Sequence, residues 1–474
     1  MTKSLLLVLA VSICLGGCTL IPEYKRPEAP VPAAWPGGPA YKETPSAKSA
    51  AADVQWRDFF TDARLRAIIG MALQNNRDLR VAALNVERAR ALYRIQRAEL
   101  LPVVEAAGSA IRQGVPGTLS NNDQAETSWR YSTSVGISSW EIDFFGRIRS
   151  LEKSALQEYF ATEEARRGAR ILLVSEVANA YLTLAADREN LQLARSTLEA
   201  QKASYNVIRR RFEVGLTPQL DLSQIQTRVD TARVDVARFT ELAARDENAL
   251  NLLAGSPVPA DLLPETLSVV ELLPDVSPGL SSEVLLRRPD ILQAEALLKA
   301  ANADIGAARA AVFPRISLTT AMGSASGDLS DLFKSGSFAW NYGPQIVLPV
   351  FDSRTWSAIK VTEVQREIAM TQYEGAIQAA FKDVADALAQ RGTVGDQMEA
   401  QQSLVNAGAD AYRLSNARYE KGSDIYLNVL DAQRSLYSAQ QGLIAIRLAR
   451  LTNQVRLYSV LGGGCDPVTP HDRE

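Results

Sequence analysis

Residues 168–187 read GARILLVSEVANAYLTLAAD and predict that the chain is built around long helices. Five residues of this stretch fall at i, i+3, i+4, i+7 and i+11, which predicts one apolar stripe along a helix: Val174, Val177, Ala178, Tyr181 and Ala185. From residue 147 to residue 213 there is no proline and only one glycine, so the helix is expected to continue throughout. At 1.5 Å per residue it would span about 100 Å. Because charged residues occur along its length, it must pack on other helices in water rather than lie in lipid.

The chain contains a second copy of this stretch. Residues 147–215 align without a gap to residues 354–422, at an offset of 354 − 147 = 207. The chain is therefore two copies of one plan: helix, strand, polar loop, strand, very long helix, glycine turn and helix. We place the first repeat at 61–255, a proline-rich linker at 256–278 and the second repeat at 279–461. The second long helix is expected to be kinked or interrupted at its glycines, Gly375, Gly392, Gly395 and Gly408.

Composition excludes several functional classes. The chain has 474 residues and a formal net charge of -3, so it lacks the positive charge with which proteins bind a nucleic-acid backbone. Its one histidine, His471, gives no basis for a histidine-based catalytic site or a multi-histidine metal site. We therefore expect no enzyme activity, no cofactor, no metal and no nucleic-acid partner.

The first residues predict export. Lys3 precedes an apolar run at 5–15 that is too short to span a hydrocarbon core of about 30 Å, which predicts a signal peptide at 1–17. Leu15-Gly16-Gly17-Cys18 resembles the bacterial lipobox, which implies cleavage before Cys18 and attachment of lipid, such as palmitate, to Cys18. The alternative is an ordinary signal peptide followed by a chance cysteine. Residues 18–60 are rich in proline and predict an extended lipid-anchored segment, and residues 462–474 are expected to be a tail.

Four short segments predict β-strands, near 103–112, 131–142, 316–325 and 338–350. In the last segment, Trp340, Tyr342 and Ile346 share one face, whereas small and polar residues share the other. Apolar and polar faces that alternate in this way, with aromatic residues at the rim, are typical of a membrane β-barrel. About ten tilted residues per strand cover the core of a bilayer. A small soluble sheet with one wet face is the alternative.

Four strands are too few to close a barrel. About eight are needed, and an open edge in lipid leaves backbone groups unpaired. The chain is therefore expected to assemble with copies of itself, and strand counting permits two, three or four copies. The same copies would place their long helices around a common axis, so the arrangement predicts a hollow passage.

The long helices are expected to end in tight turns. A glycine predicts the C-terminal cap of each long helix, and the residues after it predict the N-cap of the next helix. The first tip comprises Val214, Gly215, Leu216 and Thr217, and the second comprises Lys421, Gly422, Ser423 and Asp424. Each repeat thus forms a helical hairpin. Taken alone, such hairpins fit a spectrin-like scaffold equally well.

Motifs spread over nearly the whole chain carry a family resemblance. They are the Leu-Gly-Gly-Cys start, Pro102 and Pro314, the run Leu285-Leu286-Arg287-Arg288-Pro289-Asp290, and Tyr419-Glu420-Lys421-Gly422 followed by Val429-Leu430-Asp431-Ala432-Gln433-Arg434. The chain resembles outer membrane factors of the TolC family, in particular efflux lipoproteins of the OprM and NodT type.

The resemblance implies a mostly α-helical, internally duplicated protein that forms a homotrimer. Its twelve-stranded membrane β-barrel would be continued by a long α-helical barrel in the periplasm. It further implies a lipid-anchored channel in the outer membrane of a Gram-negative bacterium, where the chain contacts outer-membrane lipid. A periplasmic adaptor would bind the tips, and the inner-membrane pump would be proton-driven. This tripartite efflux function is the leading hypothesis. The alternative is a lipid-anchored structural or adhesion protein with a helical stalk.

Leu427, Asp431 and Arg434 are candidate gate residues at the closed end of the tunnel. They fall at i, i+4 and i+7 just inside the second tip, so they share one face of a helix. Copies of the chain would arrange them as rings, and Asp-Arg pairs between copies would hold the aperture shut. The resemblance points to these residues and to Tyr419. The alternative is a solvated helix face with an ordinary ion pair at i,i+3, and Asp221 aligns with Asn428, so the two tips are not equivalent.

Overall fold

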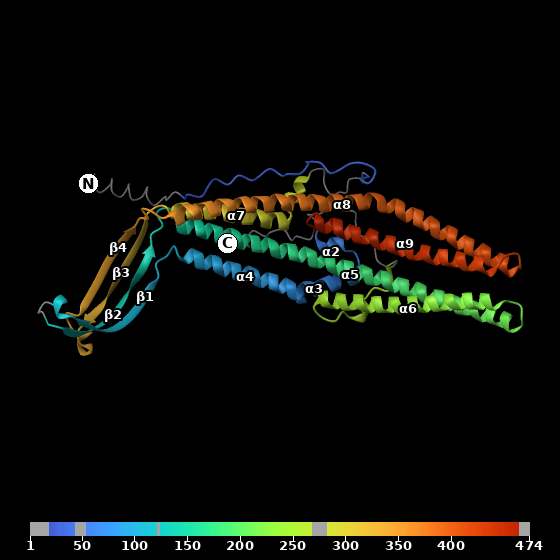
Figure 1. Ribbon diagram of the computed structural model, residues 1–474, viewed down its shortest axis with the longest axis horizontal. Coiled ribbons are helices and arrows are strands. Elements are labelled where there is room, and N and C mark those ends of the chain that lie inside the picture. The colour runs from blue at the N-terminus through green and yellow to red at the C-terminus, as the bar shows by residue number, and fades with distance from the viewer. Residues whose placement is uncertain (1–18, 43–53, 121–123, 268–281, 464–474) are drawn as a thin grey trace. The chain divides into compact units, whose positions relative to one another are not determined.

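The computed structural model describes residues 19–42, 54–120, 124–267 and 282–463. The predicted signal peptide, Cys18, residues 268–278 of the predicted linker and residues 464–474 of the predicted tail lie outside the described residues. The chain forms two compact units (Figure 1). The first comprises Met1–Glu28, Asn85–Glu163 and Gln293–Tyr373, and the second comprises Ala29–Leu84, Glu164–Leu292 and Glu374–Glu474.

In the part of the first unit that the structure describes, four strands form one antiparallel sheet. They are β1 (Val104–Val115), β2 (Glu126–Glu141), β3 (Arg315–Ser326) and β4 (Phe338–Val347), in the order β1-β2-β3-β4. Each repeat contributes one hairpin, and the pairing of β2 with β3 joins the two repeats. Within the described residues, β1 and β4 each have a neighbouring strand on one side only. A single chain therefore leaves both edges of the sheet open.

The strand ends differ from those that the alternation predicts. β1 extends to Val115, β2 begins at Glu126 and β4 ends at Val347. The register of β2 against β3 also shifts between Ile137 and Trp140, where Ser139 has a φ of 53°. Such a bulge inserts a residue into one strand and so breaks the two-residue period from which the strands were predicted.

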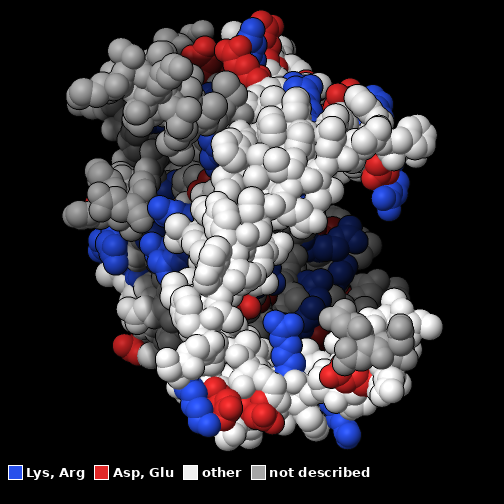
Figure 2. All heavy atoms as spheres, turned by 90° about the vertical axis from the view of Figure 1, so that its left-hand side faces the viewer, with Lys and Arg blue, Asp and Glu red and all other residues white. Residues whose placement is uncertain are grey.

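β4 exposes its large apolar side chains. Phe338, Trp340, Tyr342 and Ile346 are all between 65% and 71% exposed in the single chain. Figure 2 views the side on which Figure 1 draws the sheet, and it shows a broad area of uncharged residues. The exposed aromatic and aliphatic side chains of β4 mark a surface that contacts lipid or protein.

Side-chain hydrogen bonds connect the helices of the first unit to the sheet and to one another. α5 (Arg147–Glu213) follows β2, and Arg147 donates two hydrogen bonds of 2.8 Å to Glu141 of β2. The Tyr93 hydroxyl on α4 (Arg77–Ala98) donates to Glu152 of α5 at 3.0 Å. These contacts set the direction in which α5 leaves the sheet.

The N-terminal segment packs on α7 (Pro289–Ala310) in the first unit. The hydroxyl of Tyr24 and Nε of Arg26 donate to Glu295 Oε1 at 3.2 and 3.1 Å, and Lys299 Nζ lies 2.9 Å from the same oxygen. Burial disfavours a charged Glu295, but hydrogen bonds from Arg26 and Lys299 outweigh burial and lower its pKa. Residues 19–42 form no helix or strand, whereas Trp56–Phe59, also in the segment predicted to be extended, form the short helix α2.

The second unit is helical. It contains α2, α3 (Ala63–Asn75), α6 (Gln219–Ala254), α9 (Tyr426–Val460) and most of α5 and of α8 (Ser353–Glu420). α5 is one continuous helix with the predicted bounds, and its stripe residues, among them Val177 and Tyr181, are at most 4% exposed. α5 also has an 18-residue window of mean hydropathy 1.3, of which 61% is buried within the protein. Its apolar stripe therefore forms core.

The expected interruption of α8 is wrong, because α8 is one continuous helix through all four of its glycines. Gly392 allows close packing instead, because a Cβ added there would clash with the carbonyl oxygen of Ala40. The sequence shows a glycine but does not show which backbone approaches it.

The duplication extends beyond the tips. α6 ends at Ala254 and α9 ends at Val460, and each is followed by a glycine with a positive φ. These glycines, Gly255 and Gly462, are again 462 − 255 = 207 residues apart, with φ of 72° and 79°. Their N–H groups donate to the carbonyls of Leu252 and Ser459, at equivalent positions. Upstream the copies differ, because the first has α3 and α4 where the second has a 3-10 turn, η5 (Ser282–Arg287), and α7.

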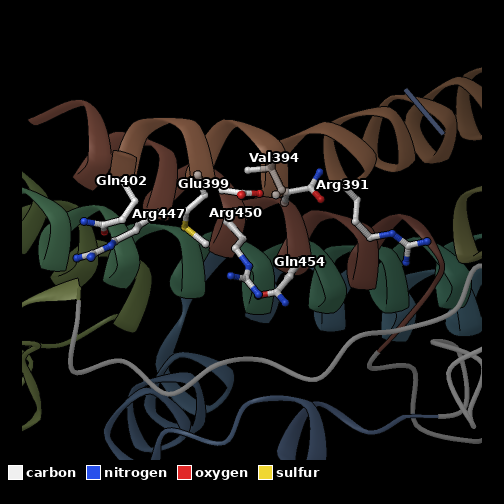
Figure 3. Close-up of a pocket in the computed structure, with 10 residues that line it drawn as sticks. Arg391, Val394, Glu399, Gln402, Arg447, Arg450 and Gln454 are labelled. Carbon is white, nitrogen blue, oxygen red and sulfur yellow. The ribbon is translucent and has the colours of Figure 1, made fainter. Parts of the chain in front are cut away.

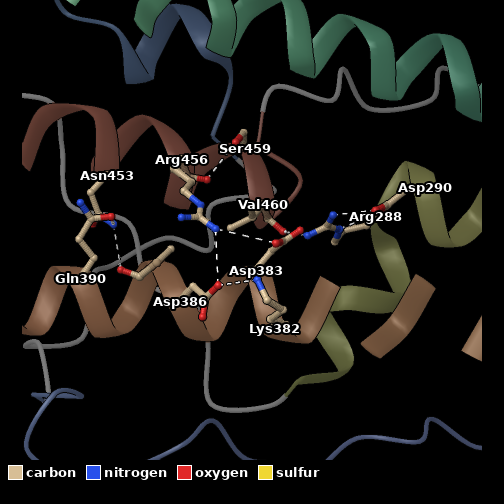
Figure 4. Close-up of polar contacts among 11 residues, drawn as sticks. Arg288, Asp290, Lys382, Asp383, Asp386, Gln390, Asn453, Arg456, Ser459 and Val460 are labelled. Atoms are coloured by element: carbon tan, nitrogen blue, oxygen red, sulfur yellow. Dashed lines mark hydrogen bonds and ion pairs between the residues drawn. The ribbon is translucent and has the colours of Figure 1, made fainter. Parts of the chain in front are cut away.

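Side chains around the end of α9 fix it in the second unit (Figure 4). Arg288 donates to the carbonyl of Val460 at 2.6 Å and pairs with Asp290 at 2.6 Å. A cation at a helix C-terminus satisfies a free carbonyl and interacts favourably with the helix dipole. Arg456 of α9 also lies 3.8 Å from both Asp383 and Asp386 of α8. These contacts give the Leu285–Asp290 run a structural role.

Candidate functional site

Both tips end in the same glycine-capped turn. At the first tip the N–H of Gly215 donates to the backbone carbonyl of Phe212 at 2.9 Å, and the N–H of Leu216 donates to the backbone carbonyl of Arg211 at 2.8 Å. At the second tip Gly422 donates to Tyr419 at 2.9 Å and Ser423 donates to Arg418 at 3.0 Å. The two glycines have φ of 75° and 73°, a left-handed conformation that other residues adopt only with strain. The predicted glycine caps are therefore correct.

The predicted N-caps are not correct. The N-cap residues are Pro218 and Ile425, and neither makes a side-chain capping bond. Thr217 instead donates to Asp221 at 3.5 Å, and Asp424 accepts from Asn428 at 2.6 Å. Hydrogen bonds from the Ile425 N–H and from Asn428, with the nearby charge of Arg418, lower the pKa of Asp424.

The four helices that lead to the tips share one apolar cluster. Its buried members are Ile208 of α5, Ile225 of α6, and Tyr426, Val429 and Leu430 of α9. Partly buried residues pack against it, including Tyr412 and Tyr419 of α8. The two hairpins of one chain are therefore packed together just above their tips.

Tyr419 lies between the hairpins. Arg211 of α5 donates to the Tyr419 hydroxyl at 2.6 Å, and its guanidinium carbon is 5.3 Å from the centre of the Tyr419 ring. The same ring lies 4.9 Å from that of Tyr426. Arg211 thus connects the first hairpin to the second by a hydrogen bond and a cation–π contact. Sequence reasoning missed this partner: Arg211 matches Arg418 in the duplication, but that match does not reveal its contact.

Leu427, Asp431 and Arg434 lie on an exposed face of α9, as their spacing predicts. Leu427 is 41% exposed, and the side chains of Asp431 and Arg434 are 52% and 65% exposed. In the single chain the acidic partner of Arg434 is Asp431 of the same helix, at 3.5 Å. The structure therefore brings these three residues together and places Tyr419 against Arg211 and Tyr426.

The remaining predicted site residues are at the tips. Val214 and Leu216 are 69% and 74% exposed, and Lys421, Gly422 and Ser423 are also exposed, whereas Thr217 and Asp424 are half-buried. The first tip thus presents apolar side chains and the second tip presents polar ones. Among the described residues there is no group of three or more His, Cys, Asp or Glu side chains able to hold a metal ion.

An open-edged sheet with exposed aromatic residues, together with two long helical hairpins, defines the class of outer-membrane channel proteins. The chain matches the family model described as outer membrane efflux protein over residues 68–256 and 280–463. The chain belongs to this family, which confirms the resemblance drawn from its motifs. It is an outer-membrane component of efflux pumps, and the family is one of transport proteins rather than enzymes.

Individual relatives of the chain are also outer-membrane efflux proteins. The chain is 50% identical over 465 residues to the toluene efflux pump outer membrane protein TtgC of Pseudomonas putida, covering 98% of this chain and 96% of that protein. The antibiotic efflux pump outer membrane protein ArpC of Pseudomonas putida shows the same identity and coverage. Among solved structures, the open state of the Neisseria gonorrhoeae MtrE outer membrane channel matches with a TM-score of 0.85 and 36% identity, over 94% of this chain and 99% of that one.

Proposed function

We propose that three copies of the chain close a twelve-stranded barrel in the outer membrane and continue it as a helical tunnel from the periplasm. The observation that carries this proposal is the sheet with two open edges and an exposed apolar face. In lipid each unpaired backbone group costs several kcal/mol. Pairing β4 of one copy with β1 of the next satisfies both edges. Strand counting alone permits other numbers of copies, and the family resemblance favours three.

The tips are the proposed docking site for a periplasmic adaptor that links the channel to a proton-driven inner-membrane pump. Exposed Val214 and Leu216 offer apolar contacts, and Lys421 and Ser423 at the equivalent positions of the second tip offer polar ones. Lipid on Cys18 would anchor the N-terminus in the outer membrane. Because relatives at 50% identity are named for toluene and for antibiotic efflux, we propose organic solvents and antibiotics as cargo.

The gate is formed by Leu427, Asp431 and Arg434 of the three copies. In the closed state Arg434 exchanges its partner on the same helix for Asp431 of a neighbouring copy. Each wet ion pair stabilises this state by only about 0 to 1 kcal/mol, so an adaptor that binds the tips has enough energy to open it. The contact of Arg211 with Tyr419 holds the two hairpins of each copy together, so movement of one tip is transmitted to the other.

Single-channel conductance in planar bilayers tests the gate. Replacing Asp431→Ala together with Arg434→Ala is expected to raise conductance several-fold, because the ring of ion pairs is lost. The matched control is Asp230→Ala with Arg233→Ala, which removes another exposed i,i+3 ion pair, 3.2 Å long, from α6. The control is expected to conduct like the unmodified protein. Unchanged conductance in the Asp431 and Arg434 variant would refute the gate assignment.

A further inference from the structure

The second unit contains a groove away from the proposed gate, between α8 and α9 (Figure 3). Its volume is about 630 Å³, which lies within the range of about 300 to 1,000 Å³ that is typical of small-molecule sites. Arg391 and Glu399 line it from α8, and Arg447 and Arg450 line it from α9. The groove is therefore large enough for a small organic molecule.

The charge of the groove is positive. Among the described residues that line it, three are arginines and one, Glu399, is acidic. Arg447 lies 3.6 Å from Glu189 of α5, which leaves it partly neutralised. Within the part of the chain that the structure describes, Arg450 makes no ion pair, although it is only partly exposed. Arginines gathered in a partly desolvated space favour a bound anion, because guanidinium groups bind carboxylate, sulfonate and phosphate oxygens in a bidentate manner.

The groove also has an apolar part. Val394 is buried and Met398 is half-buried, and both line the groove from α8. Between them, Gly395 has no side chain, and a Cβ added there would meet no atom within 4 Å. The missing side chain therefore keeps this part of the groove open. An apolar wall beside arginine side chains suits a ligand that has both an apolar body and an anionic group.

The two walls of the groove are held in place by hydrogen bonds from α8 to α9. Asn453 is 2% exposed and donates to the Ala387 carbonyl at 3.0 Å and to Gln390 Oε1 at 2.9 Å. Gln401 donates to the Ala439 carbonyl at 2.8 Å. These bonds connect the same two helices on either side of Gly395 along α8. The site is thus formed before a ligand binds, which reduces the entropy cost of binding.

We propose that this groove binds small organic anions that carry a sulfonate, carboxylate or phosphate group on an apolar body. Arg450 and Arg391 contact the anionic group, and Val394 and Met398 contact the apolar body. The proposal goes beyond the gate, because binding to the groove is measured without transport and requires no opening of the channel.

Isothermal titration calorimetry of the full-length protein, purified in detergent, tests the proposal with 2-naphthalenesulfonate as probe. Its neutral analogue 2-naphthol is expected to bind at least about tenfold more weakly, since it cannot form charge-assisted hydrogen bonds with the arginines. Titration into detergent alone corrects for partition into micelles. Absence of sulfonate binding would overturn the proposal. Binding would also be absent if a second copy of the chain covered the groove, so that case counts against the proposal as well.

Variants with opposite expected effects separate binding from folding. Arg450→Gln is expected to weaken binding of the sulfonate about tenfold, and Glu399→Gln is expected to strengthen it, because it removes a negative charge from the wall of the groove. Gly395→Leu is expected to abolish binding by filling the groove without changing its charge. Arg233→Gln, on α6, is the control and should leave binding unchanged. Equal affinities for the Arg450→Gln, Glu399→Gln and unmodified proteins would overturn the proposal.

Discussion

The two helical hairpins end in the same backbone turn but carry different side chains. Gly215 and Gly422 have nearly the same φ and make equivalent hydrogen bonds. The polar bond that follows is reversed, since Thr217 donates to Asp221 at the first tip, whereas Asp424 accepts from Asn428 at the second. The duplication thus retains the geometry of the turn and changes its chemistry.

The side chains of the two hairpins differ more along α6 and α9, the helices that follow the tips. At the offset of 207, Asp431 and Arg434 of α9 correspond to Gln224 and Thr227 of α6. The proposed gate pair therefore exists in one hairpin only. Tyr426, which is buried in the cluster above the tips, corresponds to the exposed Gln219. We infer that the first hairpin mainly supports the second, which carries the proposed gate residues.

The largest expected difference in stability between the hairpins concerns Tyr426 and its counterpart Gln219. Tyr426→Ala should destabilise the helical part by about 3 to 5 kcal/mol, because it removes a buried aromatic ring from the cluster. Gln219→Ala, at the equivalent exposed position, should change stability by less than about 0.5 kcal/mol. Thermal unfolding followed by far-UV circular dichroism measures both. Similar losses for the two variants would contradict the assignment of Tyr426 to the core and of Gln219 to the surface.

The glycine caps should instead behave alike. A Cβ at Gly215 or Gly422 would meet no atom within 4 Å, so replacement by alanine strains only the backbone. Each substitution should therefore weaken its turn by about 1 to 2 kcal/mol. Hydrogen exchange of the Leu216 and Ser423 amides measures the opening of each turn. A clearly larger effect at one tip would mean that contacts outside the turn hold that tip in place.

The smallest expected effect depends on pH. Burial, together with the neighbouring Asp187, raises the pKa of Asp246 on α6 to about 6. The folded chain then holds a proton that the unfolded chain releases at lower pH, so stability falls as pH rises towards about 6 and is level above it. The equivalent residue of α9 is Asn453. Asp246→Asn should therefore stabilise the protein at pH 7.5 by no more than about 1 kcal/mol, since Asp246 is partly exposed.

Melting temperatures at pH 5 and pH 7.5 check this expectation. The melting temperature of the unmodified protein should fall between pH 5 and pH 7.5. The corresponding fall should be smaller in the Asp246→Asn variant. Asp230→Asn on the same helix is the control, because hydrogen bonds from Gln226 and Arg233 lower the pKa of this exposed carboxyl. If the stability of the Asp246→Asn variant depends on pH as that of the unmodified protein does, Asp246 is excluded as the source of this pH dependence.

The sequence predicts those features that depend on local periodicity. The bounds of α5 follow from an apolar stripe and from missing breakers, and the glycine caps follow from the need for a positive φ. Features that depend on distant contacts could not be predicted. Gly392 accommodates the backbone of Ala40, and Tyr419 takes its partner Arg211 from the other repeat. The β2 bulge likewise depends on its pairing with β3.

We propose that one chain supplies only part of a membrane barrel, which three copies complete. Native mass spectrometry of the protein extracted from outer membranes counts these copies. Detergent should be needed to keep the protein in solution, and the released complex should have the mass of three acylated chains. A single unacylated chain that stays in solution without detergent would refute this proposal.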